Sequence, residues 1–198
     1  MSAPFVVGVA GGTASGKTTL AEGLAERWGA TLVAFDRYYN HGTPNTNFDH
    51  PDALDIARLL VDLDHLRAGD HADLPRYDFA THRRQAAVDR VSATPMIVVE
   101  GILLLVDPAV RARLDLAVFV HAAPDVRLIR RVRRDVSTRG RTVESVFEQY
   151  LRTVRPMHDR YVEPSRGHAH LLADGEAVLA EEIARVAVQI EQRRPAPR

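Results

Sequence analysis

The segment GVAGGTASGKTT at residues 8–19 restricts the fold of this chain more than any other stretch. Gly11, Gly16, Lys17 and Thr18 satisfy the pattern GxxxxGK followed by Ser or Thr. A β-rich apolar run precedes the pattern and an amphipathic run follows it, which is the context in which it forms a phosphate-binding P-loop. The alternative is a glycine-rich turn with an incidental lysine, and strand, spacing and helix together argue against it.

The residue types of this loop predict which groups of a nucleotide it holds. Lys17 is the only lysine among 26 lysine and arginine residues. A compact ammonium can follow a phosphate during transfer, whereas a planar guanidinium needs a fork geometry that a tight loop does not provide. Backbone N–H groups surround the β-phosphate, and the Thr18 hydroxyl faces Mg²⁺. We expect nucleotide contacts from Gly11, Gly12, Thr13, Ala14, Ser15, Gly16, Lys17, Thr18 and Thr19.

Short apolar runs alternate with longer amphipathic runs along the rest of the chain. They predict strands at 5–10, 31–35, 96–101, 116–122 and 169–173, and helices at 17–28, 51–68, 124–137, 142–161 and 176–193. This order predicts an α/β protein with the P-loop NTPase fold, in which a five-stranded, mostly parallel sheet carries helices on both faces. Pro51 marks the expected start of one helix, and Pro156 predicts a kink in another.

Two segments depart from this alternation. Residues 70–91 read as short alternating pieces with turns, which predicts a small antiparallel β lobe rather than another crossover. The sequence RRPAPR at the C-terminus has the composition of a disordered tail, expected at 194–198. We therefore expect a single domain over 1–193.

Charge and composition restrict the kinds of partner. Twenty-six basic and 26 acidic residues give a formal net charge of zero, so nothing draws the whole molecule to nucleic acid or to a membrane surface. The chain has no cysteine, and its N-terminus lacks the basic flank of a signal peptide. We expect a cytoplasmic protein with no nucleic-acid or membrane partner.

Two acidic residues lie at the carboxyl ends of predicted strands, at the edge of the sheet that holds the P-loop. Asp36 comes after the second strand, where a general base can accept the proton of a substrate hydroxyl. Glu100 ends the run MIVVEG, where it can join Thr18 as a ligand of Mg²⁺. The alternatives are a turn-capping aspartate and a solvent-facing glutamate.

The segment 127–141 carries seven arginines against one acid, Asp135. So dense a charge needs a counter-ion, and we predict an arginine-rich helical lid that closes over triphosphate oxygens. We assign this role to Arg131, Arg134, Arg139 and Arg141, with Arg134 and Arg139 stabilising the transferring phosphoryl group. A solvated helix face explains Arg127, Arg130 and Arg133.

Several classes of phosphate-binding protein share a P-loop. A GTPase reads guanine through an NKxD segment, and with Lys17 already committed no second lysine remains to form one. A non-catalytic nucleotide sensor needs no general base, so Asp36 together with Glu100 argues against that class. A kinase explains all these residues.

Seven segments occur in the same order as in one family of kinases: GGTASGKTT, NFDHPDALD, YDFATHRR, VVEGILLL, RLIRRVRRDV, RGR and FEQYLRTVRPMHDRYVEP. On these the chain resembles the uridine-cytidine kinase family from residue 5 to about residue 172. The resemblance implies transfer of a γ-phosphate from ATP (or GTP), with Mg²⁺, to the 5′-hydroxyl of a pyrimidine ribonucleoside. It also implies a homotetramer.

The resemblance further implies individual roles. Asp36 matches the family's base, Thr18 and Glu100 match its magnesium ligands, and Asp49 and Arg131 match residues that hold the ribose hydroxyls. The nucleoside pocket is matched by Tyr39, Tyr77, Phe79, His82, Ile102, Arg141 and Gln149. The residues alone favour a plainer interpretation, with Tyr77 and Phe79 in the core of the small lobe and His82 at the surface.

Two departures from the family pattern leave the substrates open. The connection NHGTPNT is shorter than the family's, which leaves the acceptor open between a pyrimidine nucleoside and another hydroxyl metabolite, such as a sugar phosphate or pantothenate. The segment LLADGEAVLAEE replaces a glycine-rich stretch near the donor base, which leaves ATP and GTP open as donors.

Overall fold

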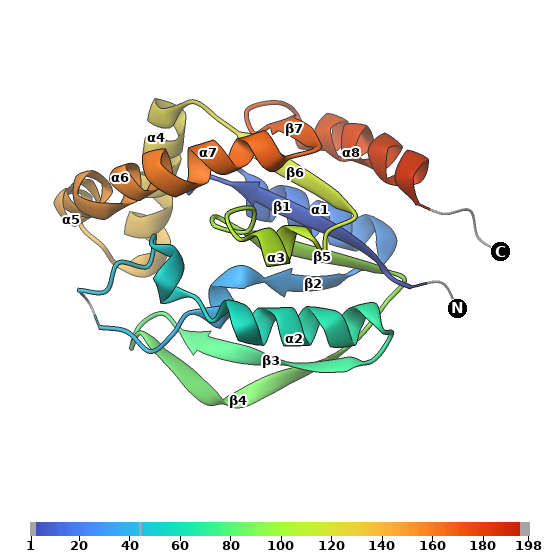
Figure 1. Ribbon diagram of the computed structural model, residues 1–198. Helices are drawn as coiled ribbons and strands as arrows, with labels where there is room; N and C mark the ends of the chain where they lie inside the picture. Colours follow the sequence, from blue (N-terminus) through green and yellow to red (C-terminus); the bar gives the residue numbers. More distant parts are fainter. Residues whose placement is uncertain (1–2, 44, 195–198) are drawn as a thin grey trace.

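The structure, a computed structural model, describes residues 3–43 and 45–194. Its main sheet has five strands in the order β2-β5-β1-β6-β7 (Figure 1), and every neighbouring pair is parallel. The strands are β1 (Phe5–Gly11), β2 (Thr31–Ala34), β5 (Met96–Gly101), β6 (Leu116–His121) and β7 (Leu171–Asp174). The predicted five-stranded α/β sheet is confirmed, and it is parallel throughout.

Helices cover both faces of this sheet because alternate strand residues point to opposite sides. Val6 belongs to a buried cluster with α2 (Ile56–Arg67) and α3 (Pro108–Arg111). Val7 belongs to a second cluster with α1 (Lys17–Trp28) and α8 (Leu179–Arg193). Figure 1 shows α2 and α8 on opposite sides of the sheet. The strands are therefore buried on both faces, as continuous apolar runs predict.

A two-stranded antiparallel hairpin, β3 (His71–Asp78) and β4 (Arg83–Ser92), lies beside α2 (Figure 1). The small lobe predicted at 70–91 is confirmed, one residue further along the chain. Arg84 joins the hairpin to the main domain, since its guanidinium donates to Asp55 Oδ2 at 2.9 Å and to the Tyr38 carbonyl at 3.1 Å. These bonds tie the start of β4 to the segments that follow β2 and precede α2.

The residues between β6 and β7 are mostly helical. They comprise α4 (Pro124–Arg139), α5 (Val143–Gln149), α6 (Arg155–Met157) and α7 (Glu163–Ser165), with π-helical turns at Tyr150–Val154 and His158–Val162. Pro156 lies between the two π-helical turns, and proline cannot donate the bond that a regular α-helix needs there. The helix predicted at 142–161 begins at Val143 and runs past Pro156 to Ser165, with π-helical turns on both sides of the proline.

Two predicted helix starts were wrong. Pro51 begins a short 3₁₀ turn, Pro51–Ala53, and α2 begins only at Ile56, where the Asp55 side chain accepts from the Arg58 N–H at 3.0 Å. A bridge between Tyr39 and Leu54 separates turn from helix. The last helix begins at Leu179 rather than at residue 176.

The tail predicted at 194–198 lies outside the described residues except for Arg194. Within 3–43 and 45–194, no helix combines the length and the apolar character that crossing a membrane requires.

Candidate active site

The predicted P-loop forms between β1 and α1 with backbone angles that its glycines make possible. Gly11 has φ 147° and Gly16 has φ 102°, values that residues with a side chain rarely adopt. Ala14 has φ 57° and is one of two non-glycine residues with positive φ among those described. Gly16 is the N-cap of α1, so the first N–H groups of the helix are directed toward the loop, as anion binding requires.

Two neighbouring segments support this loop from outside. A Cβ atom at Gly12 would lie 2.6 Å from a terminal nitrogen of Arg127. A Cβ atom at Gly175, in the segment after β7, would overlap the carbonyl oxygen of Ser15. The Gly175 carbonyl in turn accepts from Arg130 at 2.8 Å. The segment after β7 therefore touches the loop directly, a contact that the sequence did not reveal.

A cavity of about 630 Å³ opens beside the loop, within the size range of small-molecule sites. Its wall includes Lys17, Thr18, Asp36, Glu100, Arg130, Arg134, Arg139, Asp174, Gly175, Leu179 and Glu182. The structure thus brings the predicted lysine, both predicted carboxylates and two predicted arginines to one space.

Glu100 is buried at the end of β5, with 6% of its surface exposed, so the solvent-facing alternative was wrong. The Thr18 hydroxyl donates to Glu100 Oε2 at 3.3 Å, and the Lys17 ammonium lies 3.6 Å from the same oxygen. Among the described residues, no three His, Cys, Asp or Glu side chains cluster as a metal site. One hydroxyl and one carboxylate suit Mg²⁺, which binds through few protein ligands together with substrate phosphates and water.

Asp36 lies in the 3₁₀ turn Phe35–Tyr38 that follows β2, and its carboxylate lines the cavity. The turn closes through the backbone, since the Tyr39 N–H donates to the Asp36 carbonyl at 3.4 Å. Burial and, after it, the nearby Glu100 raise the pKa of Asp36, while Lys17 works in the opposite direction. A higher pKa makes a carboxylate a better proton acceptor.

An aromatic cluster lies beyond Asp36, formed by Tyr39, Phe48, Tyr77, Phe79 and His82. Tyr39 meets Phe48 edge to face at 5.1 Å, and the His82 ring is nearly parallel to Phe48 at 5.2 Å. Phe79 packs on Tyr77 at 5.1 Å and is 51% exposed.

The plainer interpretation was wrong for Phe79, which is exposed rather than in a core. His82 is partly exposed in the hairpin turn, as a surface histidine would be, and its ring stacks on Phe48. Tyr77 packs partly against the main core, but its buried hydroxyl has no hydrogen-bond partner among the described residues. Sequence reasoning missed Phe48, although it stands inside the segment NFDHPDALD.

Asp49 and Arg131, expected to act together, lie near one another. Burial raises the pKa of Asp49, while Arg131 and a hydrogen bond from the Thr153 hydroxyl at 3.4 Å work to lower it. The hydrogen bonds of Arg131 go to Thr13 Oγ1 and Gln149 Oε1, both at 2.9 Å. Arg131 therefore links the P-loop to the helix that carries Gln149. Ile102, the remaining predicted pocket residue, is partly buried against the main core.

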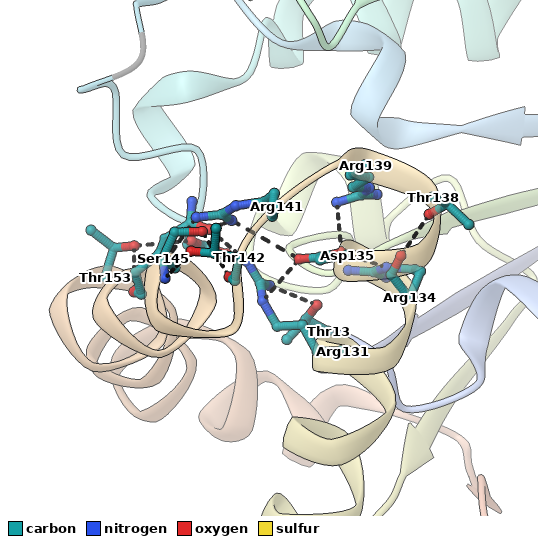
Figure 2. Close-up of polar contacts among 12 residues, drawn as sticks. Thr13, Arg131, Arg134, Asp135, Thr138, Arg139, Arg141, Thr142, Ser145 and Thr153 are labelled. Atoms are coloured by element: carbon teal, nitrogen blue, oxygen red, sulfur yellow. Dashed lines mark hydrogen bonds and ion pairs between the residues drawn. The ribbon is translucent and has the colours of Figure 1, made fainter.

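The predicted lid arginines converge on Asp135, as Figure 2 shows. Asp135 is fully buried and forms ion pairs with Arg131 at 3.5 Å, Arg134 at 2.9 Å, Arg139 at 3.4 Å and Arg141 at 4.0 Å. The single acid of this segment is thus the counter-ion of the group.

The assignment of a solvated face to Arg127 and Arg130 was wrong, whereas Arg133 is exposed as expected. Arg127 is 5% exposed, its Nε donates to the Ala122 carbonyl at 3.1 Å, and its Nη2 lies 3.2 Å from His158 Nε2. Arg130 lines the cavity. Arg127 is covered by the P-loop and His158, and Arg130 donates to the Gly175 carbonyl.

Known proteins resemble this chain in sequence and in fold. The model of the Phosphoribulokinase / Uridine kinase family matches residues 6–176. A uridine kinase of Chloroflexus aurantiacus is 47% identical over 182 residues, 87% of each chain. One of Halobacterium salinarum is 42% identical over 177 residues, 85% of this chain and 79% of the relative. The structure of phosphoribulokinase from Rhodobacter spheroides has the same fold, with a TM-score of 0.63 at 15% identity over 86% of this chain and 70% of that one.

Proposed function

The chain belongs to the phosphoribulokinase/uridine kinase family, and we propose that it transfers the γ-phosphate of ATP or GTP to the 5′-hydroxyl of uridine or cytidine with Mg²⁺. The position of Asp36 carries this proposal. Its carboxylate lines the cavity beside the P-loop, and Tyr39 of the aromatic cluster follows three residues later. In this proposal Asp36, the proton acceptor, lies between two halves of the site. The donor half surrounds the P-loop, and the acceptor half surrounds the aromatic cluster.

The donor half binds the triphosphate through the N–H groups of the loop and through Lys17. Thr18 and Glu100, 3.3 Å apart, would hold Mg²⁺. The ion, when bound, neutralises charge on the β- and γ-phosphate oxygens. Gly175 and the residues after it line the same cavity at the place where the donor base would lie.

The acceptor half binds the nucleoside. A flat pyrimidine ring can pack against the edges and faces of Tyr39, Phe48 and Tyr77. The buried Tyr77 hydroxyl can form a hydrogen bond with a polar group of the base. Asp49 is an acceptor suited to ribose hydroxyl protons, and Arg131 lies beside it.

In the transfer step, the 5′-oxygen forms a bond to the γ-phosphorus while its proton passes to the Asp36 carboxylate. The bond between the γ-phosphorus and the bridging oxygen breaks, and the nucleoside diphosphate leaves. Arg134 and Arg139, which line the donor cavity, balance negative charge on the moving phosphoryl group.

A product assay tests this proposal. The protein is incubated with Mg²⁺, ATP or GTP, and one acceptor at a time: uridine, cytidine, adenosine, a pentose phosphate or pantothenate. We expect UMP and CMP as the main products. Phosphorylation of the sugar phosphate or pantothenate alone would assign the chain to a related kinase, and no product with any acceptor would support a non-catalytic nucleotide-binding protein.

A further inference from the structure

Asp135 lies at the centre of the arginine group, between the two halves of the proposed site. Figure 2 shows Arg134 and Arg139 on one side of its carboxylate, and Arg131 and Arg141 on the other. Each oxygen of the Asp135 carboxylate pairs with a different two of these arginines. Oδ1 pairs with Arg134 and Arg139, and Oδ2 pairs with Arg131 and Arg141.

The Oδ1 partners belong to the donor half. The side chains of Arg134 and Arg139 line the cavity beside the P-loop. Arg134 donates from Nε to Oδ1 at 2.9 Å, and the Arg139 pair is longer, at 3.4 Å. The Arg139 side chain is 51% exposed, so it can turn toward a triphosphate at little packing cost.

The Oδ2 partners belong to the acceptor half. Arg131 and Arg141 both donate to Gln149 Oε1, and Arg131 also lies beside Asp49. Their distances to Oδ2 are 3.5 and 4.0 Å, and Oδ2 is buried without a hydrogen bond from any described residue. Oδ2 of Asp135 can therefore accept further hydrogen bonds.

We infer that Asp135 is a positioning residue that couples donor binding to acceptor binding; the inference rests on the proposed nucleoside kinase function. A triphosphate competes with Oδ1 for Arg134 and Arg139. The carboxylate is fully buried and cannot replace those partners with water. Its charge then acts more strongly on the two arginines at Oδ2, which fixes them where they meet Gln149 and face the nucleoside.

The predicted coupling is positive and reciprocal. Each substrate makes the other bind more tightly, and linkage requires the same factor in both directions. A purely structural role for Asp135 predicts something different, because a general loosening weakens both affinities and leaves their ratio unchanged.

The test compares dissociation constants measured by calorimetry with no turnover. Uridine is titrated into protein with Mg²⁺, in the absence and in the saturating presence of the inert analogue β,γ-methylene ATP. In wild type we expect the analogue to tighten uridine binding at least about fivefold. In Asp135→Asn, which keeps the shape and removes the charge, we expect the factor to fall below about twofold.

Asp62→Asn is the matched control. Asp62 is 3% exposed and accepts from Tyr38 and from Arg58, four residues before it, but it lies in α2 and contacts none of the four arginines that pair with Asp135. We expect this variant to keep the wild-type coupling factor.

Arg139→Gln provides a second measurement should Asp135→Asn fold poorly, because Arg139 is half-exposed. Its direct loss of phosphate affinity cancels in the ratio, and we expect the coupling factor to fall as well. A wild-type factor near one, or an undiminished factor in a folded Asp135→Asn or Arg139→Gln protein, would overturn the inference. Failure of uridine and cytidine to bind wild type at all would instead count against the proposed function.

Discussion

The Lys17 ammonium lies 3.6 Å from Oε2 of Glu100 and 3.5 Å from the Thr18 hydroxyl. Lysine, hydroxyl and carboxylate thus form one compact group at the start of α1. The compact ammonium of a lysine fits between these oxygens, whereas the planar guanidinium of an arginine is larger and needs two parallel acceptors. This geometry explains why a chain that otherwise uses arginine keeps a lysine here.

We therefore predict that Lys17→Arg, although it conserves charge, lowers kcat/KM by about 10²-fold or more, since misplacement by about 1 Å at a transfer site has effects of that size. Steady-state kinetics with ATP and uridine measure this. Arg133→Lys, at an exposed position of α4, is the reverse control and should behave as wild type. Retention of more than about a third of wild-type kcat/KM in Lys17→Arg would show that the ammonium is not specifically required.

A second prediction concerns Asp36. Asp36→Asn is nearly isosteric and cannot accept a proton, so kcat should fall roughly 10²–10⁴-fold, the usual contribution of a positioned base. Affinity for β,γ-methylene ATP should stay within about threefold, because the loop and Lys17 still hold the phosphates. Asp64→Asn, an exposed carboxylate paired with Arg113, is the control. An unchanged kcat would remove Asp36 from the mechanism.

Local patterns predicted the elements that depend on neighbours in sequence. The P-loop, its flanking strand and helix, and the hairpin at β3 and β4 follow from glycine positions and from alternation of apolar residues. The start of α2 could not be predicted from Pro51, because proline suits the first turn of a 3₁₀ segment as well as that of an α-helix. The bridge between Tyr39 and Leu54 and the backbone angles of Leu54 show that the chain is extended before α2 begins.

Contacts between distant segments could not be predicted in this way. Thr153 reaches Asp49 across 104 positions, and Arg127 meets His158 across 31. An arginine in a basic run reads as solvated until the segments that cover it are known. In the sequence, Asp135 is a single acid beside seven arginines, and only its burial in the fold shows that it is the centre of the group.

Gly175 offers a prediction about the contact between the segment after β7 and the P-loop. In Gly175→Ala the added methyl would overlap the Ser15 carbonyl, a backbone atom that cannot move alone. We expect a loss of about 1–3 kcal/mol in the free energy of unfolding and a fall of about 10–100-fold in kcat/KM for ATP. Urea unfolding and kinetics measure both. Gly167→Ala, where the Cβ would meet nothing within 4 Å, should change neither, and equal behaviour of the two variants would refute the contact.

His158 predicts a pH dependence of stability. Burial and the adjacent Arg127 lower the pKa of His158 from its ordinary value of 6.5, although Glu163 opposes this. Below pH 6.5 the unfolded chain binds a proton that the native protein does not, so stability falls as pH falls from 6.5 toward the lowered native pKa.

We expect His158→Gln to lose less stability than wild type between pH 7.5 and 5.5, by at most about 1.4 kcal/mol for each pH unit in that window. Urea unfolding at each pH gives the comparison, and the carboxylates common to both proteins cancel. His168→Gln, at an exposed site, should follow wild type. Superimposable pH profiles of wild type and His158→Gln would mean that His158 protonates equally in both states.

The last prediction is that ribonucleosides are preferred to 2′-deoxyribonucleosides, and it depends on Asp49. Burial raises the pKa of this carboxylate, while Arg131 and the Thr153 hydroxyl act in the opposite direction. In its ionised form Asp49 offers two oxygens to the 2′- and 3′-hydroxyls. Without the 2′-hydroxyl the carboxylate lacks a partner, and a fully closed site would then reject the analogue strongly. Asp49 is not fully buried, however, and water can replace part of the lost bond.

We therefore expect about 10–10³-fold discrimination in kcat/KM between cytidine and 2′-deoxycytidine in wild type. Asp49→Ala should reduce that ratio toward one, mainly by slowing cytidine. Thr153→Val removes the neighbouring hydroxyl but keeps the carboxylate, so its ratio should stay close to that of wild type. Equal kcat/KM for both nucleosides in wild type would contradict the proposed role of Asp49 in binding the 2′-hydroxyl. A ratio that survives in Asp49→Ala would move ribose recognition to Arg131, because its guanidinium is the charged group beside Asp49 that also bonds both the P-loop and Gln149.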